Sequence, residues 1–302
     1  MVGVAIEPGR GSAAGLDQGT LEFLRSTFGP RTADFLERMD PDGEVGRLLT
    51  GQVVAYIDPE TLVGKRLLDF GCGSGASSFI LAGLLPQTEI IGVELDPNLV
   101  AIGRRVAGGW GGAAPRFLVS PGGTEIPRGL GQFDVIMLSA VYEHLLPEER
   151  RVVLPKLWAA LRPGGILFVN QTPHRWFPYD HHSTGLWGIN YLPAALARRY
   201  ALLAPMNRDF NRTLRPWKAH LRGGLRGGTE RSIIRELTGG HPGRARIIQP
   251  RLHRDRADYW LASTSPRWRR FKQAIAGFFR LSERLLGTIP SMNVDVAIER
   301  RS

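Results

Sequence analysis

Short apolar runs alternate with helical segments from Lys65 to Val169, and this alternation constrains the fold more than any other feature of the chain. Five runs have the length and composition of buried strands: KRLLDF, TEIIGVEL, RFLVS, FDVIMLSA and GGILFVNQT. The segments between them, such as ASSFILAGLL and PEERRVVLPKLWAALR, have apolar residues at helical spacing. Strands that alternate with crossover helices form parallel sheets covered on both faces. The pattern therefore predicts an α/β fold.

Three glycines, Gly71, Gly73 and Gly75, follow the first predicted strand at alternate positions and precede a helix. Because glycine has no Cβ, such a turn lets the backbone approach a ligand closely. Asp69 precedes the turn, and Glu94 ends the next predicted strand. A carboxylate at that separation is placed to bind both hydroxyls of a ribose. Dinucleotide-binding folds use similar turns, so the turn alone leaves the cofactor open.

Four segments resemble, in order and separation, the motifs of the class I S-adenosylmethionine-dependent methyltransferases: LLDFGCGSG, GVELDPNLV, FDVIMLSAVYEHL and LRPGGILFV. The resemblance covers residues 63–169 and continues more weakly to the end of the chain. It implies a Rossmann-like, seven-stranded, mostly parallel sheet with helices on both faces, whose last strand, NVDVAIER, is antiparallel. It also implies S-adenosylmethionine as the cofactor.

The same resemblance implies which residues hold this cofactor. Asp69 and the glycine turn would face its methionine half, Glu94 its ribose and Leu95 its adenine. The third strand of the family commonly ends in an Asp that reaches the adenine, whereas this chain has Ser120, so side-chain recognition of adenine is in doubt and a backbone contact would substitute. The full predicted cofactor set is Asp69, Gly71, Cys72, Gly73, Gly75, Glu94, Leu95 and Ser139.

We predict four parts along the chain. Residues 1–60 form a helical lead-in, and residues 61–171 form the cofactor-binding core. Residues 172–228 are too long for an ordinary connection and are predicted to be a substrate lid inserted after the fifth strand. Residues 229–302 complete the fold and include a basic amphipathic helix, PRWRRFKQAIAGFFRLSERLLG. We favour packing of this helix on the sheet over contact with a membrane, because a predicted strand follows it.

Glu143 and His144 follow the fourth predicted strand, which faces the cofactor's sulfonium in the family. In some small-molecule methyltransferases a further Glu upstream completes a divalent metal site at this place. This chain has Ala140 at that position, so we predict no metal. His144 is a candidate catalytic residue, with the alternative that it starts a helix and is hydrogen-bonded beneath the pocket.

His182 is the favoured catalytic base. It lies in the run from His174 to Trp187, which resembles a stretch of bacterial methyltransferases found near glycan and secondary-metabolite genes. Removing a hydroxyl proton while a methyl group arrives requires a base that titrates near neutrality, and imidazole meets this requirement. Asp180 would orient the ring or accept the proton itself. Aromatic residues of the run, such as Trp176, would line a pocket for a sugar or an aromatic ring.

The net charge of +11 is distributed unevenly. Residues 1–197 hold 16 Lys and Arg against 20 Asp and Glu, whereas residues 198–302 hold 23 against 8. A basic region of this size attracts phosphates, nucleic acid or anionic lipid. However, 35 of the 39 cations are Arg, a bias that a GC-rich genome produces without selection for binding. The charge therefore leaves a nucleic-acid partner or peripheral membrane contact open.

The sequence favours an O-methyltransferase that acts on a small-molecule or saccharide hydroxyl, with His182 and Asp180 as general base. One alternative is an RNA methyltransferase that uses the basic C-terminal third, although no RNA-binding module is recognisable. Another is a relative that binds the cofactor without turnover. We expect a cytoplasmic protein, because no secretory signal or membrane span is recognisable and the one cysteine, Cys72, forms no internal disulfide. The sequence does not indicate the oligomeric state.

Overall fold

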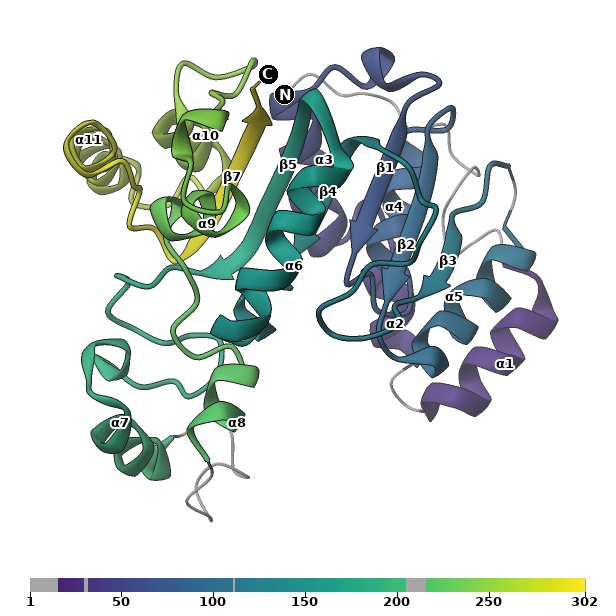
Figure 1. The fold of residues 1–302 in the computed structure, drawn as a ribbon, viewed down its shortest axis with the longest axis horizontal. Coiled ribbons are helices and arrows are strands. Elements are labelled where there is room, and N and C mark those ends of the chain that lie inside the picture. The colour runs from purple at the N-terminus through teal and green to yellow at the C-terminus, as the bar shows by residue number, and fades with distance from the viewer. Residues whose placement is uncertain (1–15, 30–31, 111, 205–215, 302) are drawn as a thin grey trace. The chain divides into compact units, whose positions relative to one another are not determined.

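Seven strands form one sheet in the order β3-β2-β1-β4-β5-β7-β6 (Figure 1). Neighbours in the first part of the sheet are parallel, whereas β7 pairs with β6 in the antiparallel direction. This arrangement confirms the predicted Rossmann-like sheet and its antiparallel last strand. The computed structural model describes four stretches of the chain: residues 16–29, 32–110, 112–204 and 216–301.

The chain divides into two compact units, which we describe separately. The first unit consists of residues 1–137, 160–166 and 249–254. The second unit consists of residues 138–159, 167–248 and 255–302. The four-part division expected from the sequence stays a prediction, and the middle of the predicted lid, residues 205–215, lies outside the described residues.

The first unit contains parallel strands and the helices that precede and connect them. Its strands are β1 (Arg66–Phe70), β2 (Glu89–Glu94), β3 (Arg116–Val119) and most of β4 (Phe133–Ser139). Its helices are α1 (Gln18–Phe28), α2 (Thr32–Met39), α3 (Glu44–Tyr56), η3 (Pro59–Leu62), α4 (Ala76–Leu84) and α5 (Pro97–Gly108). Three of these helices, Gln18–Phe28, Thr32–Met39 and Glu44–Tyr56, lie in the stretch where the apolar spacing predicts helices.

Local sequence signals fix where the helices of the first unit begin. Asp17 caps α1 by accepting a hydrogen bond from the Thr20 amide, and Asp96 caps α5 in the same way from Asn98. The apolar faces of α1, α2, α4 and α5 then meet around Phe79. The core cluster so formed consists of Leu16, Leu24, Phe35, Met39, Cys72, Phe79, Val100, Ile102, Val106 and Phe117.

The second unit contains the later strands and several short helices. Its strands are β5 (Leu161–Pro173), most of which lies in this unit, β6 (Ala245–Ile247) and β7 (Asn293–Arg300). Its helices are η4 (Tyr142–His144), α6 (Pro147–Ala160), η5 (Ile189–Tyr191), α7 (Ala194–Tyr200), η6 (Ala201–Leu203), α8 (Trp217–Arg222), α9 (Glu230–Leu237), η7 (Pro242–Arg244), α10 (Arg256–Ser263) and α11 (Arg269–Leu286).

The predicted lid has its own small core. Helices α7 and α8 were not predicted, because this stretch is rich in Pro and Gly. Their apolar side chains pack with those of the turn that follows Trp187. The cluster consists of Leu186, Ile189, Ala197, Ala201, Ala204 and Leu225. The helices here are therefore stabilised mainly by packing and not by propensity.

A buried network of charges joins α9, α10 and α11 in the second unit. Glu230 accepts a hydrogen bond from Arg256 at 2.7 Å, and Arg256 also pairs with Glu283 at 3.2 Å. His174 Nε2 lies 2.8 Å from the Thr288 hydroxyl, which in turn donates to Glu230. Burial acts to raise the pKa of Glu230, but His174 and Arg256 hold that pKa below its usual range. His174 therefore has a structural role.

Candidate functional site

The glycine turn after β1 is left-handed at each of its glycines. The φ angles are 77° at Gly71, 55° at Gly73 and 97° at Gly75. A Cβ on Gly75 would lie 2.5 Å from the ring of Phe117, so this glycine permits close packing of the helix start. A Cβ on Gly73, in contrast, would meet no atom of the described residues within 4 Å. Gly73 thus borders open space, as a glycine that faces a ligand should.

Asp69 lies at the end of β1 and is buried. Its Oδ2 accepts hydrogen bonds from the hydroxyls of Ser77 and Ser78, both at 2.6 Å. Burial raises the pKa of the Asp69 carboxyl, and the serine hydroxyls partly offset this effect. The two serines belong to the first turn of α4, so Asp69 ties the strand end to the helix that follows the glycine turn.

Glu94, at the end of β2, lies against the same turn. Its Oε2 accepts a hydrogen bond from the Gly73 amide at 2.9 Å, and its Oε1 accepts one from the Leu95 amide at 2.6 Å. The structure therefore brings Glu94 and Gly73 together, as the sequence predicts. Leu95 is exposed, whereas Cys72 is buried beneath the turn. Of the predicted cofactor residues, Ser139 belongs to the second unit.

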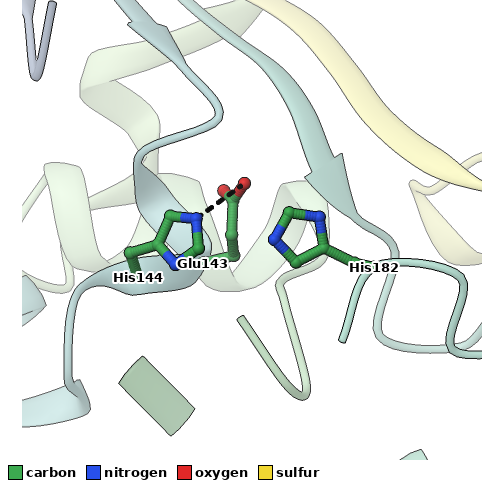
Figure 2. Close-up of side chains that lie close together, drawn as sticks. All are labelled: Glu143, His144 and His182. Atoms are coloured by element: carbon green, nitrogen blue, oxygen red, sulfur yellow. Dashed lines mark ion pairs between the residues drawn. The ribbon is translucent and has the colours of Figure 1, made fainter. Parts of the chain in front are cut away.

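A second group of candidate residues lies in the second unit. Glu143 and His144 come from η4, and His182 comes from the segment after β5. One potential ligand atom from each of the three lies within 4.8 Å of the other two. Figure 2 shows the Glu143 carboxylate between the two imidazole rings, with a ring nitrogen of His182 directed toward it. The sequence predicted both histidines as candidates but did not predict this cluster.

Glu143 is fully buried, although it carries an acidic group. Its Oε2 accepts a hydrogen bond from the Thr172 hydroxyl at 2.9 Å. Its Oε1 has no hydrogen-bond partner in the part of the chain that the structure describes. Burial raises the pKa of Glu143, while the nearby His144 acts to lower it. A buried carboxylate oxygen without a partner is costly and is uncommon in folded proteins.

His144 is held in one orientation by α8. Its Nδ1 lies 2.9 Å from the carbonyl oxygen of Arg222, which only accepts hydrogen bonds, so Nδ1 carries the proton. In the neutral ring Nε2 is then an acceptor, and it lies 3.9 Å from Glu143 Oε1. Arg222 is itself fixed by two hydrogen bonds to Glu149, at 2.7 and 2.6 Å. The tautomer of His144 is thus set by a neighbouring element.

His182 fits against a glycine of the chain that follows α8. A Cβ on Gly224 would lie 2.4 Å from His182 Cδ2 and 2.7 Å from its Nε2. Burial, followed by the neighbouring His144, lowers the pKa of His182 below its ordinary value. The ring is therefore neutral at neutral pH, the state that both a general base and a metal ligand require.

Asp180 has different partners from those predicted. Its carboxylate accepts hydrogen bonds from the Ser183 hydroxyl at 2.7 Å and from the Thr184 amide at 2.7 Å. The Thr184 hydroxyl also donates to it at 2.5 Å. These bonds hold the turn that carries His182. A direct role of Asp180 in orienting the His182 ring or accepting the proton stays a prediction.

Two residues beside the cluster have left-handed backbone although they are not glycine. Ala140 has a φ of 54° and Gln171 a φ of 57°. The Ala140 amide donates to the Asn170 carbonyl, and the Gln171 amide donates to the Asp295 carboxylate, both at 3.0 Å. Such backbone costs about 1 kcal/mol or more per residue and often occurs at functional sites. Sequence analysis gave no signal for this strain.

The sequence also missed residues that support the cluster, namely Thr172, Arg222 and Gly224. Thr172 lies at the end of β5, where polar residues follow the apolar run of the strand. Gly224 is the second of two consecutive glycines, which signal a turn but not its partner. Arg222 acts through its carbonyl oxygen, a group that every residue has. Of the three, therefore, Thr172 alone had a sequence signal that points to a site.

Comparisons with known proteins bear on this site. A model of a methyltransferase domain matches residues 68–167. The chain is 34% identical over 116 residues to the carboxy-S-adenosyl-L-methionine synthase of Chromohalobacter salexigens, covering 36% of this chain and 40% of that protein. It is 31% identical over 109 residues to the demethylmenaquinone methyltransferase of Thermus thermophilus, covering 36% of this chain and 48% of that protein. The chain thus spans less than half the length of these two curated relatives.

Among solved structures, that of the plantazolicin methyltransferase in complex with SAH is similar to 94% of this chain and 96% of that one. The TM-score is 0.48 and the sequence identity is 12%.

The matched residues contain the glycine turn, Glu94 and the strands that carry them. The open space at Gly73 and the adjoining carboxylate of Glu94 fit a cofactor with a ribose. Residues 68–167 therefore form a methyltransferase domain of the class I S-adenosylmethionine-dependent kind, whose cofactor is S-adenosylmethionine.

Proposed function

We propose that this chain transfers the methyl group of S-adenosylmethionine to a hydroxyl of a small molecule or saccharide. The observation that carries the proposal is the neutral His182 ring next to Glu143 and His144. A hydroxyl is a weak nucleophile until its proton is removed, and an imidazole with a free lone pair removes it. An amine acceptor needs no such base in its neutral form.

The chemistry divides between the two groups of residues. The cofactor supplies an activated methyl group, so the protein has to align the acceptor and remove one proton. Asp69, Glu94 and the glycine turn would bind the cofactor. His182 would take the hydroxyl proton while the acceptor oxygen bonds to the methyl carbon and the sulfur retains the electron pair of the broken bond. His144 and Asp180 would position the segments around the base.

Exposed aromatic side chains of the predicted lid favour a saccharide or an aromatic acceptor. Trp176, Trp187 and Tyr191 are 44%, 66% and 55% exposed. Large aromatic surfaces on one short segment suit stacking on the apolar face of a sugar or on a ring. The relatives named above, a carboxy-S-adenosyl-L-methionine synthase and a demethylmenaquinone methyltransferase, act on small molecules by their names. These observations favour a small acceptor.

The RNA alternative has less support. Several arginines of residues 198–302 form ion pairs with acidic side chains and are less available to phosphates. These pairs are Arg222 with Glu149, Arg246 with Glu299, Arg256 with Glu230, and Arg280 with Asp255.

The test is to incubate the full chain with donor labelled on the methyl group and with extracts of source cells, then to identify the labelled fraction. We expect label in a small-molecule or glycan fraction and not in RNA. His182→Ala should lower the rate by about 100-fold or more without changing donor affinity, whereas His181→Ala should change the rate little. Donor affinity with no labelled product in any fraction would support the non-catalytic alternative. Labelled RNA would support the RNA methyltransferase alternative.

A further inference from the structure

Three acceptor atoms converge at the Glu143, His144 and His182 cluster (Figure 2). Glu143 Oε1 is buried and has no hydrogen-bond partner among the described residues. In the neutral His144 ring Nε2 is an acceptor, because Nδ1 lies 2.9 Å from the Arg222 carbonyl oxygen. The His182 ring supplies the third potential ligand atom. Acceptor atoms that face one another repel unless a proton or a cation lies between them, and of the three residues Glu143 is buried.

We propose that Glu143, His144 and His182 bind a divalent transition-metal ion. Two imidazoles and one carboxylate form a donor set that suits Mn²⁺, Fe²⁺ or Zn²⁺, whereas Mg²⁺ and Ca²⁺ favour oxygen ligands throughout. Donor atoms about 2.1 Å from one ion lie about 3 to 3.5 Å apart, compared with 4.8 Å at most here. Side-chain adjustments of about 1 Å therefore complete the site.

The surroundings of the three side chains resemble the outer shell of a metal site. Metal-bound histidines usually donate their second nitrogen to a carbonyl or carboxylate, as His144 does to Arg222. Ligating carboxylates are usually hydrogen-bonded as well, as Glu143 is by Thr172. Gly224 leaves room for the His182 ring. Glu143 and His144 thus already have the hydrogen-bond partners that would orient them.

This site differs from the one considered in the sequence analysis. The upstream Glu of other small-molecule methyltransferases is Ala140 in this chain, and His182 supplies a ligand from another segment. Three protein ligands leave open positions for an acceptor hydroxyl, whose pKa a bound metal lowers. This use of the metal rests on the proposed function. With the metal bound, His182 would act as a ligand in place of the general base described above, and the proton of the acceptor hydroxyl would leave to solvent.

Metal binding is measured on the full chain without donor or acceptor. The protein, freed of affinity tag and treated with chelator, is titrated with MnCl₂ and with ZnCl₂ in a calorimeter. We expect one ion per chain. His144→Ala, His182→Ala and Glu143→Gln should each weaken binding by at least tenfold, because even outer-shell changes cost that much. His181→Ala, a change at the neighbouring histidine, should leave the affinity unchanged.

Because Glu143 is buried, Glu143→Gln also requires a check of the melting temperature. His144 is partly exposed, with 42% of its side-chain surface accessible, so His144→Ala tests the site where folding is not at risk. The absence of stoichiometric binding, or a metal affinity in His144→Ala and His182→Ala equal to that of the parent protein, would overturn the proposal. Transfer of the labelled methyl group to an acceptor, measured separately, reports on the proposed function, so failure of the metal proposal is distinguishable from failure of the proposed function.

The C-terminal helix α11 supports an independent inference. It packs through Ala276 and Phe279 against Trp260 of α10 and against Ile289, whereas the prediction was packing on the sheet. A different set of apolar side chains on the helix is exposed. Phe271, Phe278, Leu281 and Leu285 are 66%, 57%, 55% and 68% exposed.

The exposed apolar residues form a stripe. Phe271, Phe278 and Leu285 recur every seven residues, or two helical turns, so they lie on one side of α11. Arg270 and Arg284 are exposed and lie beside this stripe. An amphipathic helix with aromatic residues on one side and arginines at its margin suits the boundary between lipid headgroups and acyl chains. Across the described residues, no helix has the length and hydropathy needed to cross a bilayer.

From this stripe we infer that α11 docks the protein on the surface of an anionic bilayer. The commitment to an anionic surface comes from charge on the helix itself, because Arg269, Arg270 and Arg284 of α11 are exposed. Each basic residue near such a surface contributes about 1 kcal/mol to binding. The acceptor could then be a lipid-linked molecule presented at that surface.

Flotation of the full chain with vesicles tests this inference. We expect binding to vesicles that contain phosphatidylglycerol, and weaker binding to phosphatidylcholine alone. The double variant Phe278→Asp with Leu285→Asp should lose at least tenfold in affinity, whereas Gln273→Asp, on another side of the helix, should lose much less. Absence of binding to the anionic vesicles would overturn the inference. So would a dimer in light scattering that the double variant dissociates, since a second copy would then cover the stripe.

Discussion

The glycine turn of the first unit and the metal-like cluster of the second unit are built in opposite ways. The turn draws its residues from a short stretch, in which Asp69, Gly73 and Gly75 follow one another between a strand and a helix. The cluster draws on residues far apart in the chain, since His144, His182 and Gly224 come from three separate segments. Local motifs therefore reveal the first site, whereas folding assembles the second.

The two regions also differ in how their polar atoms are satisfied. In the turn, both oxygens of Glu94 accept backbone hydrogen bonds, and Asp69 accepts two from serine hydroxyls. In the cluster, Glu143 has a buried oxygen with no hydrogen-bond partner in the described part of the chain. The carboxylates of the turn thus find their partners within the fold, whereas the unpartnered oxygen of the cluster is what the metal proposal explains. Each of the following variants tests one side of this contrast.

The largest expected effect is on donor binding. Gly73→Arg should weaken the affinity for S-adenosylmethionine by at least 100-fold, or about 2.7 kcal/mol, because the side chain fills the open space at the turn. Calorimetric titration measures it. Gly64→Arg is the matched control, since Gly64 also has a positive φ, of 70°, and a Cβ there would meet no described residue within 4 Å. Unchanged affinity in Gly73→Arg would contradict the assigned cofactor site.

The next effect is on stability. Gly75→Ala should lower the free energy of unfolding by about 2 to 3 kcal/mol, because its Cβ would lie 2.5 Å from Phe117 and the backbone φ is 97°. Urea denaturation gives the value. Gly64→Ala isolates the cost of the φ angle alone and should be smaller. Equal losses in the two variants would show that packing against Phe117 does not limit this position.

A smaller effect is expected at the cluster. Gly224→Ala should reduce the methyl-transfer rate by about tenfold, or about 1.4 kcal/mol, because the new methyl group displaces His182. Gly240→Ala is the control, since Gly240 has the same φ of 90° and no described residue near its Cβ position. A rate constant measured with saturating donor separates this effect from binding. A normal rate in Gly224→Ala would mean that the position of His182 is unimportant.

Sequence patterns predicted the sheet because each strand of the core is a continuous apolar run, and they predicted the cofactor turn because its residues are neighbours. They could not predict α7 and α8, whose short helices depend on the cluster around Ile189 and Ala197. Likewise, no spacing rule places Gly224 against His182. Such contacts arise from tertiary structure and leave no trace in local sequence.

Asp180 illustrates a signal that was present but interpreted differently. A carboxylate three and four residues before Ser183 and Thr184 is typical of a side chain that caps a turn. The sequence analysis emphasised its proximity to His182 instead. The apolar residues of α11 were also visible in the sequence, where they were interpreted as one packing face. The helix has two apolar faces, and it packs with one and leaves the other accessible.

The smallest effect separates function from stability within the glycine turn. Asp69→Asn should weaken donor binding but raise the free energy of unfolding at pH 7 by about 1 kcal/mol. Burial raises the pKa of Asp69 above its unfolded value, so ionisation favours the unfolded chain, and stability is lost as pH rises through the folded pKa. Asparagine cannot ionise, so the gain should shrink as pH falls toward 4. Urea denaturation at both pH values measures this, and a variant less stable than the parent at pH 7 would show that the hydrogen bonds from Ser77 and Ser78 require the charge.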